Sequence, residues 1–430
     1  MLKSIFTQIW NRKQSNSWII IELILVFCLT WYITDYFFVL IYNYNLPSTR
    51  NVNHTWQINV AEYPAYSPQY KAEEDNPEAL EANFNRILQM IKNHPDVESL
   101  AILFNTSTPG GGGYWGTGFV IPTDTNKIVS GQRITFDPQQ DYFGVFKYTS
   151  NNGEKPISTG DFNWNDPNSV VMGQLVANQL FPDQSALGKE VFAKYDKQNF
   201  RIVGTVDDIK RFAYQRPQNA FYFPQRLDST NLRDAEIAIR SRSSVSDVLF
   251  KENFRKEMGK SLQIGNFYLK SIISYKQLAA KTDTEFGMDS EVRTRIYMMA
   301  FFLVNILLCI IGTFWYRINI RREEIGIRKA LGSSSTGIRN ILILESLCLL
   351  AIATLPAMIV SYQFVHAGLI DTLGANRGNP TVYLTDCTFL RFLITNAITW
   401  IIMAAVVIAA VWLPARKAAA MEAADALHYE

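Results

Sequence analysis

Histidine and cysteine, which most often bind metals or act as nucleophiles, are scarce in this sequence of 430 residues. Each occurs four times, and neither set has the spacing of a metal site or of a nucleophile with its base. The positions are His54, His94, His366, His428, Cys28, Cys309, Cys348 and Cys387. All four cysteines lie outside the long hydrophilic segment 43–293, which excludes a disulfide framework there.

Nucleotide-binding motifs are missing as well. The sequence has no G-x-x-x-x-G-K-[ST] motif, so it has no phosphate cradle for ATP. Residues 111–116 satisfy G-x-G-x-x-G by letter, but a dinucleotide fingerprint needs a helix directly after it, and here a strand is expected over 117–121. We interpret Gly110–Gly118 as a loop of open role, and Asp207-Asp208 as a solvated turn. The sequence predicts no enzyme and no catalytic, cofactor-binding or metal-binding residues.

Charge of one sign does not dominate. The 41 basic and 39 acidic side chains give a net charge of +2, which argues against a nucleic-acid partner. Hydrophobic residues make up 48% of the chain and are concentrated in four runs. The runs are Trp18–Tyr42, Ile296–Trp315, Ile341–Val365 and Phe392–Leu413. Each approaches or exceeds the roughly 20 residues that cross a bilayer, so we predict transmembrane helices over 18–42, 294–316, 341–365 and 392–413.

Flanking charge predicts the orientation of these helices. Three segments (the N-terminus, 317–340 and the C-terminal tail) hold eleven basic and five acidic side chains, whereas 43–293 holds 27 basic and 29 acidic ones. The positive-inside rule therefore places both termini in the cytoplasm. We predict an amphipathic cytoplasmic helix over 1–17, a cytoplasmic loop over 317–340, a short extracytoplasmic loop over 366–391 and a cytoplasmic tail over 414–430.

Three carboxylates lie in or beside the predicted spans: Glu22, Asp35 and Glu345. A carboxylate at the bilayer centre costs about 3 kcal/mol, so such residues tend to be functional or buried in a bundle. Glu22 and Glu345 lie near the cytoplasmic ends, and Asp35 is expected near the outer surface. We favour structural or interfacial roles over a proton relay.

Segment 43–293 has mixed periodicity. Helical patterns cover 78–93, 169–180 and 246–258, and strand patterns cover 97–105, 200–206 and 236–239. From about Phe267 onward the pattern reads as a helix that continues into the second span as a stalk. The predicted fold class is an α-helical membrane protein with four transmembrane helices and a large α/β extracytoplasmic domain inserted between helices 1 and 2.

The segment 321–332 after the second span separates its charges by face. At 100° per residue, Glu323, Glu324, Ile327 and Leu331 fall on one side, with Ile320 and Ala330. Arg321, Arg322, Arg328 and Lys329 fall on the other side, which suits anionic lipid headgroups. Gly332 is expected to cap the helix. The acidic and aliphatic side is then free to contact another protein.

These residues resemble the FtsX-like and MacB-like permeases of ABC systems. The segment Glu324–Gly332, followed by Glu345, is similar to their cytoplasmic signature, and Pro414–Ala419 and Ala426–Glu430 are similar to their C-terminal ending. Ala423 and His428 depart from that ending, where proline and arginine are usual. Phe181–Lys189 and Phe200–Val206 resemble the MacB-type periplasmic core domain.

The resemblance implies a permease of the bacterial cytoplasmic (inner) membrane that works as a homodimer or paired permease. It implies a separate ABC ATPase subunit, which binds the ATP, and membrane lipids as a further partner; a periplasmic adaptor and an outer-membrane channel are optional ones. The expected ATPase-coupling residues are Glu323, Glu324, Ile325, Gly326, Ile327, Arg328, Leu331 and Gly332, with Glu323, Glu324, Ile327 and Leu331 in contact.

The predicted function is export or mechanotransmission, with antimicrobial, peptide or lipid-like cargo. Two alternatives stay open: an FtsX-type regulator of cell-wall hydrolases or of a sensor, and a ligand-sensing membrane receptor.

Overall fold

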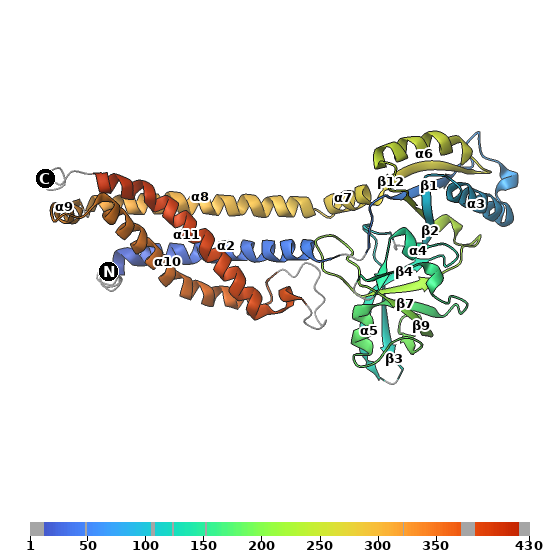
Figure 1. The fold of residues 1–430 in the computed structure, drawn as a ribbon, viewed down its shortest axis with the longest axis horizontal. Helices are drawn as coiled ribbons and strands as arrows, with labels where there is room; N and C mark the ends of the chain where they lie inside the picture. Colours follow the sequence, from blue (N-terminus) through green and yellow to red (C-terminus); the bar gives the residue numbers. More distant parts are fainter. Residues whose placement is uncertain are drawn as a thin grey trace. The chain divides into compact units, whose positions relative to one another are not determined.

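The computed structural model describes residues 13–47, 50–104, 108–122, 124–150, 153–320, 322–370 and 383–420. The chain divides into two compact units, 1–44 with 289–430 and 45–288, which we call the helical unit and the inserted unit (Figure 1). Most of the amphipathic helix predicted over 1–17 lies outside the described residues, and so does the end of the tail.

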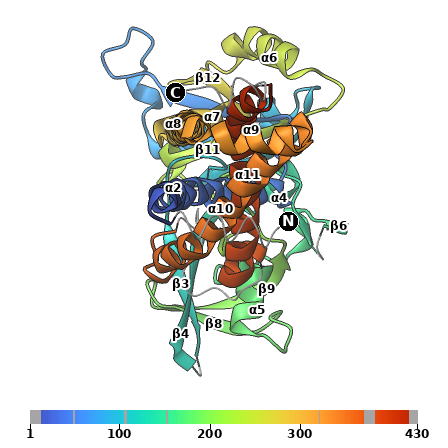
Figure 2. The ribbon, with the colours of Figure 1, turned by 90° about the vertical axis from the view of Figure 1, so that its left-hand side faces the viewer.

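Among its described residues, the helical unit contains four long helices, one short α-helix and the 3-10 segment η4 (Leu384–Asp386). The long helices are α2 (Lys13–Asn45), α8 (Met288–Ile320), α10 (Ser335–His366) and α11 (Thr388–Ala420), and the short one is α9 (Arg322–Ala330). Within the described residues, these four long helices are long and apolar enough to cross a membrane. The start of α2 and the end of α11 lie at the end of the bundle that carries α9, which faces the viewer in Figure 2 (Figures 1 and 2).

The core of the helical unit lies between α2, α10 and α11. Phe27 and Trp31 of α2, Leu349 of α10 and Met403 of α11 are fully buried there. In the most apolar stretch of α2, 56% of the residues are buried, compared with 11% in α8. Helix α8 therefore leaves most of its apolar surface uncovered by the described chain. That surface includes Phe301, Val304 and Leu308.

The inserted unit is built on one ten-stranded sheet, in the order β10-β7-β9-β8-β3-β4-β2-β11-β1-β12. Its strands are β1 (Thr55–Glu62), β2 (Val97–Phe104), β3 (Gly116–Ile121), β4 (Asp124–Phe136), β7 (Ser169–Gly173), β8 (Glu190–Ala193), β9 (Gln198–Val206), β10 (Ala220–Pro224), β11 (Ala235–Ser241) and β12 (Phe267–Ser274). A two-stranded sheet pairs β5 (Thr149–Ser150) with β6 (Lys155–Pro156). An additional parallel pairing of β10 with β4 closes β10, β7, β9, β8, β3 and β4 into a ring.

The closed ring encloses an aromatic core. The rings of Phe119 and Phe221 lie 4.6 Å apart, and Phe200 and Phe223 pack at 5.1 Å. Helix α5 (Gln174–Leu180) adds Val176 to the same core. Inward-facing residues of the strands fill the interior, so the ring is a packed core.

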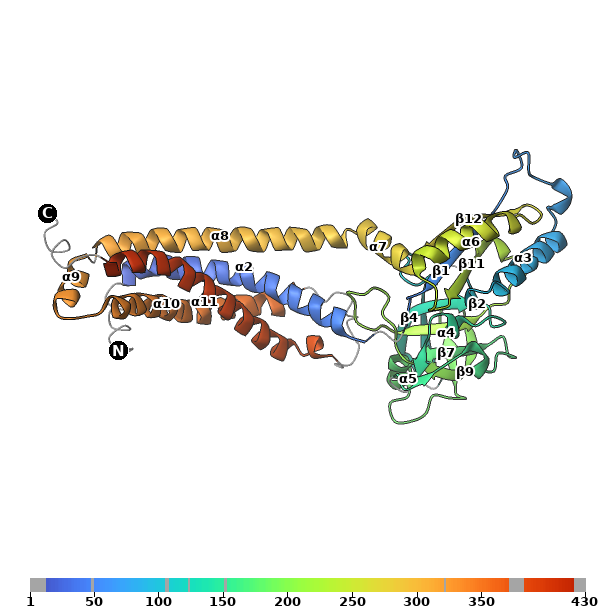
Figure 3. The ribbon, with the colours of Figure 1, turned by 45° about the horizontal axis from the view of Figure 1, so that its top comes forward.

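The remaining strands, β2, β11, β1 and β12, form an antiparallel sheet that α3 (Pro77–Lys92) and α6 (Asp247–Ser261) cover. Figure 3 shows both helices beside these strands. Asn76 and Ser246 cap the two helices by accepting a backbone N–H. The other helical segments are α4 (Tyr142–Val145), α7 (Tyr275–Glu285), η1 (Ala72–Glu74), η2 (Thr159–Asp161), η3 (Leu232–Asp234) and η4 (Leu384–Asp386).

The predicted helices over 78–93 and 246–258 and the strands over 97–105, 200–206 and 236–239 are confirmed, but the helix predicted over 169–180 is wrong in its first part. Residues 169–173 form β7, which pairs with β9 and β10, and the helix α5 begins only at Gln174. The β-branched pair Val170-Val171 is buried between two neighbouring strands, so pairing outweighs the helical pattern.

The continuous stalk helix predicted from Phe267 is also wrong. Residues 267–274 form β12, which pairs along its length with β1. Helix α7 follows and ends at Glu285, and Gly287 adopts a left-handed backbone (φ 72°) before α8 begins at Met288. A residue with positive φ ends a helix, so the path from the sheet to α8 contains a break.

Candidate coupling site

Helix α9 lies between α8 and α10, and its end is fixed by a Schellman motif. The N–H of Gly332 donates to the carbonyl of Lys329 (2.9 Å), and the N–H of Ser333 donates to that of Arg328 (3.0 Å). Gly332 has φ 92°, which confirms its predicted capping role. Two residues later, the Ser334 hydroxyl accepts the N–H of Gly337 (3.1 Å) and starts α10. The turn after α9 is therefore defined at both ends.

The two faces of α9 differ in exposure. Ile327 and Leu331 are 52% and 81% exposed, and Glu323 is exposed beside them. Ile325 is only 6% exposed and packs into the core of the helical unit, and Gly326 is buried next to it. The outer side of α9 therefore carries two exposed aliphatic side chains four residues apart beside an acid, and its inner side is anchored in the bundle.

The members of the predicted coupling set differ in burial. Ile325 and Gly326, which were not among the four residues predicted to be in contact, lie against their own bundle, where Ile325 is an apolar anchor on the inner side of the helix. Arg328 and Lys329 are half-buried and interact with other parts of the chain. The side chain of Glu324 lies outside the described residues. Glu323, Ile327 and Leu331 form the exposed set, which we call the α9 face.

Of the two predicted membrane carboxylates, Glu345 lies inside the bundle and Glu22 is partly exposed. Glu345 on α10 is almost completely buried and interacts within the chain. Glu22 on α2 is half-buried and hydrogen-bonded to the thiol of Cys309 on α8. Buried carboxylates that face a bundle interior, rather than lipid, are the usual arrangement in membranes.

Asp35 of α2 is paired inside the bundle. It is nearly fully buried and forms a bidentate ion pair with Arg391 of α11, in which the Arg391 Nε lies 2.9 Å from Asp35 Oδ1 and a second bond joins Nη2 to Oδ2. Close to it, Trp31 donates its indole N–H to Thr395 (3.0 Å). The loop predicted over 366–391 is wrong at its end, because Arg391 lies in the first turn of α11. The pair joins α2 to α11 by charge-assisted bonds.

In the inserted unit, the start of α7 is attached to the sheet. Ser274 caps the helix, and the next residue, Tyr275, donates its buried hydroxyl to Glu236 of β11 (2.6 Å). Thr108 donates a second bond to the same carboxylate. Burial raises the pKa of Glu236 above its usual value, and these two hydrogen bonds act against the rise. Helix α7 is therefore joined to β11 through a buried contact.

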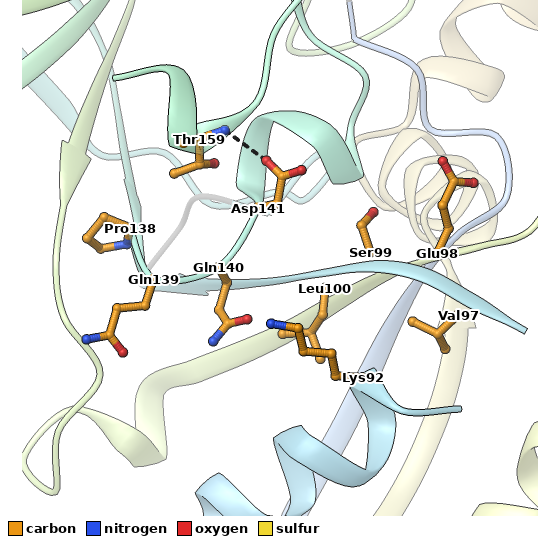
Figure 4. Close-up of a pocket in the computed structure, with 11 residues that line it drawn as sticks. Lys92, Val97, Glu98, Ser99, Leu100, Pro138, Gln139, Gln140, Asp141 and Thr159 are labelled. Carbon is orange, nitrogen blue, oxygen red and sulfur yellow. Dashed lines mark hydrogen bonds between the residues drawn. The ribbon is translucent and has the colours of Figure 1, made fainter. Parts of the chain in front are cut away.

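A polar pocket of about 340 Å³ lies in the same unit, where β2 passes between α3 and the turn after β4 (Figure 4). Lys92, Glu98, Ser99, Gln139 and Gln140 line it with both charges, a hydroxyl and two amides. The Ser99 hydroxyl oxygen is buried and has no hydrogen-bond partner among the described residues. The carboxylate of Asp141, also in the lining, accepts hydrogen bonds from the backbone N–H groups of Thr159 (2.8 Å) and Gly144 (3.1 Å). These groups suit a small hydrophilic ligand better than an apolar one.

Comparison with known proteins agrees with this arrangement. A family model for the MacB-like periplasmic core domain matches residues 43–257, and one for the C-terminal part of FtsX-like permeases matches residues 296–423. An uncharacterized ABC transporter permease of Methanocaldococcus jannaschii is 25% identical over 189 residues. That alignment covers 42% of this chain and 44% of the relative, so the chain spans less than half the length of the curated relative it matches.

Three solved structures are similar to part of this chain. The periplasmic region of MacB from Actinobacillus actinomycetemcomitans has 13% identity and a TM-score of 0.32, covering 54% of this chain and 94% of that one. A domain of a putative permease protein from Porphyromonas gingivalis has 16% identity and a TM-score of 0.29, covering 44% and 76%. The extracellular domain of the transporter YknZ from Gram-positive bacteria has 13% identity and a TM-score of 0.28, covering 50% and 100%.

Four apolar helices with a globular α/β unit inserted between the first and the second define an integral membrane protein. The chain belongs to the MacB-like and FtsX-like permeases, a family of ABC transporter permeases. The family predicted from the signature of α9 is therefore confirmed.

Proposed function

We propose that this chain is the permease subunit of an ABC export or mechanotransmission complex, in which a separate ATPase subunit binds the α9 face. The observation that carries the proposal is the composition of α9. Its outer side presents Ile327, Leu331 and Glu323, while Ile325 holds its inner side in the bundle core. An exposed apolar side would be unfavourable in water unless another protein covers it.

The chain itself has the properties of a passive transmitter in this proposal. It contains no phosphate-binding motif, so ATP is bound and hydrolysed by the partner subunit. A displacement of α9 acts on α8 and α10, which directly precede and follow it. Helix α8 leads through Gly287 to α7, and the bond of Tyr275 to Glu236 passes the displacement to the sheet.

We place the protein in the bacterial cytoplasmic membrane with both termini in the cytoplasm and the inserted unit outside. Two observations support this orientation. The start of α2 and the end of α11 lie at the same end of the bundle as α9 (Figure 1), and basic residues are in excess in the N-terminus, in 317–340 and in the C-terminal tail. The uncovered apolar surface of α8 supports contact with lipid or with a second permease copy. Antimicrobial, peptide or lipid-like molecules are the proposed cargo.

The test is co-purification of the ATPase from membranes. Glu323→Lys/Glu324→Lys and Leu331→Asp should each reduce recovery of the ATPase subunit at least tenfold and leave membrane insertion unchanged, because they place repulsive or polar groups in the contact. Glu78→Lys/Glu252→Lys, which reverses two exposed charges on α3 and α6, is the matched control. Recovery of the ATPase at wild-type levels with all α9 variants would contradict the proposal.

The polar pocket favours ligand sensing as a second candidate function. Trialanine, a small zwitterionic peptide, is a suitable probe for a pocket that offers Lys92, Glu98 and two amides. Calorimetric titration of the full chain should give binding that Lys92→Ala or Gln140→Ala abolishes and that Lys194→Ala, an exposed cation elsewhere, retains. Heat changes that are the same for all four proteins would remove this candidate.

A further inference from the structure

Helix α8 carries an exposed apolar stripe on one side. Val304, Leu308, Gly312 and Trp315 follow one another at intervals of four, four and three residues, so at 100° per residue they fall within about 80° of arc. The side chains of Val304, Leu308 and Trp315 are 56%, 61% and 42% exposed. Gly312 leaves open space among them, because a Cβ atom added there would meet no neighbouring atom within 4 Å. We call these four residues the α8 stripe.

A cation from a second helix lies at one end of this stripe. The ammonium nitrogen of Lys417 on α11 lies 4.2 Å from the centre of the Trp315 ring. Figures 1 and 3 show that α11 ends beside α8, at the end of the bundle that carries α9. Lys417 is exposed, and within the part of the chain that the structure describes it forms no ion pair and the indole N–H of Trp315 donates no hydrogen bond. An ammonium group and an indole N–H are therefore both available to a negatively charged ligand.

The positions of these groups along the helices match the depth of a phospholipid. Trp315 is the last residue of one apolar run, and Lys417 lies four residues beyond Leu413, the last residue of another. Val304 precedes Trp315 by eleven residues. This separation corresponds to about 16 Å of helix, which is close to half of a hydrocarbon core of about 30 Å. The α8 stripe therefore spans one leaflet, with the indole and the ammonium group at the level of the headgroups.

We propose that Lys417 and Trp315 bind the phosphate of an anionic phospholipid whose acyl chain lies along Val304, Leu308 and Gly312. The ammonium group of Lys417 pairs with the phosphate, and the indole N–H of Trp315 donates a hydrogen bond to it. The ligand is a lipid because its phosphate and acyl chain follow one another in the same order as the cation and the α8 stripe. It is anionic because a choline or ethanolamine headgroup carries a cation beside its phosphate, which Lys417 repels.

The bound lipid joins α8 to α11 beside α9. Helix α8 gains most from such a contact, because only 11% of its most apolar stretch is buried by the described chain. The site requires the membrane-spanning helices alone and does not depend on an ATPase at the α9 face.

The first test counts lipids bound to the full chain by native mass spectrometry from detergent micelles. Wild type should bind dioleoyl phosphatidylglycerol at least about fivefold more tightly than dioleoyl phosphatidylcholine, and Lys417→Gln should reduce this ratio to below about twofold. Arg416→Gln is the matched control and should keep the ratio, because this neighbouring guanidinium lies over Trp412 of its own helix (5.4 Å).

Three outcomes of this test would overturn the proposal. Equal affinities of wild type for the two lipids would show that the site does not select an anionic headgroup. Equal losses in Lys417→Gln and Arg416→Gln would show a diffuse attraction between charges in place of a site. Displacement of the lipid by soluble glycerol 3-phosphate would show an anion site that needs no acyl chain.

The second test identifies what covers the α8 stripe. Leu308→benzoylphenylalanine places a photoreactive side chain there in the full chain, in nanodiscs that contain phosphatidylglycerol and phosphatidylcholine. Illumination should give lipid adducts in which phosphatidylglycerol exceeds its share of the nanodisc lipid, and Lys417→Gln should remove this enrichment. Cross-linked dimers in place of lipid adducts would show that a second copy of the chain covers the stripe, and lipid adducts without enrichment would show unselective lipid contact; either result would refute the site.

Discussion

The buried pair of Asp35 and Arg391 should dominate the stability of the helical unit. Replacing one partner, as in Asp35→Leu or Arg391→Leu, leaves the other charge buried without compensation, because both side chains are almost completely enclosed. Breaking a buried pair in this way costs about 3–5 kcal/mol. The double variant Asp35→Leu/Arg391→Leu removes both charges and should recover to within about 1 kcal/mol of the wild type, or exceed it.

Equilibrium unfolding of the full chain in mixed micelles, followed by circular dichroism, measures these differences. The four proteins form a double-mutant cycle, from which we expect a coupling free energy of at least about 2 kcal/mol. Arg416→Leu, which removes an exposed cation from the same helix α11, is the control and should change stability by less than about 1 kcal/mol. If Asp35→Leu and Arg391→Leu were as stable as the control, the reasoning that each buried charge needs the other would be refuted.

Three further predictions concern the inserted unit. Asp207 and Asp208, which we predicted in a solvated turn, are instead buried and half-buried, respectively. Burial raises the pKa of Asp208 from 3.8 to about 7, so the folded state holds this proton more tightly than the unfolded state, and stability should fall as pH rises from about 4 to about 7. The loss of unfolding free energy amounts to at most about 4 kcal/mol. The amide oxygen of Asp208→Asn can still accept the N–H of Leu175, so the melting temperature of this variant should depend less on pH. Curves of melting temperature against pH that run parallel for the two proteins would contradict this prediction. Gly110→Ala should destabilise the unit by about 1–3 kcal/mol, through backbone strain and the clash with Ala279. Gly153→Ala is the control for backbone strain alone, because Gly153 has φ 92° but no atom within 4 Å of the added Cβ. Equal losses of stability for the two variants would show that the Ala279 contact contributes nothing. Tyr275→Phe removes one of the hydrogen bonds to Glu236, which should lower stability by about 1–3 kcal/mol. Amide hydrogen exchange should become faster in α7 but not in α3. Unchanged exchange in α7 would show that this bond does not attach the helix to the sheet.

Much of the architecture could be predicted because its signals are long. Four apolar runs define the spans, and the residues around α9 carry a family signature that the matching models confirm. Helix α3 was predictable because its five buried residues repeat at helical spacing. Patterns of this length average over local ambiguity.

The errors arose where short segments depend on distant partners. β7 and β12 are five and eight residues long, and each is a strand only because other strands pair with it. The sheet order, with β10 returning to β4, has no local signal at all. In β7 and β12, pairing with distant strands therefore outweighs the local helical pattern.

The site shows the same division. The exposed set on α9 follows from its helical periodicity, but the anchoring of Ile325 depends on helices far away in the sequence. The ion pair of Asp35 with Arg391 had a usable signal: an acid inside one apolar run and a base at the edge of another, each costly in a membrane without the other. The bond of Tyr275 to Glu236 had none, since neither residue type is unusual in a hydrophilic segment.

Because β10 turns back onto β4, the ten-stranded sheet ends on β12 alone. A terminal strand offers unsatisfied backbone groups to any extended chain nearby and is the usual starting point for aggregation. β12 carries the charged and exposed Lys270 near its middle, a residue type that discourages such strand addition. A single guarded edge should help the inserted unit to stay soluble at the high local concentration found when many copies crowd one membrane.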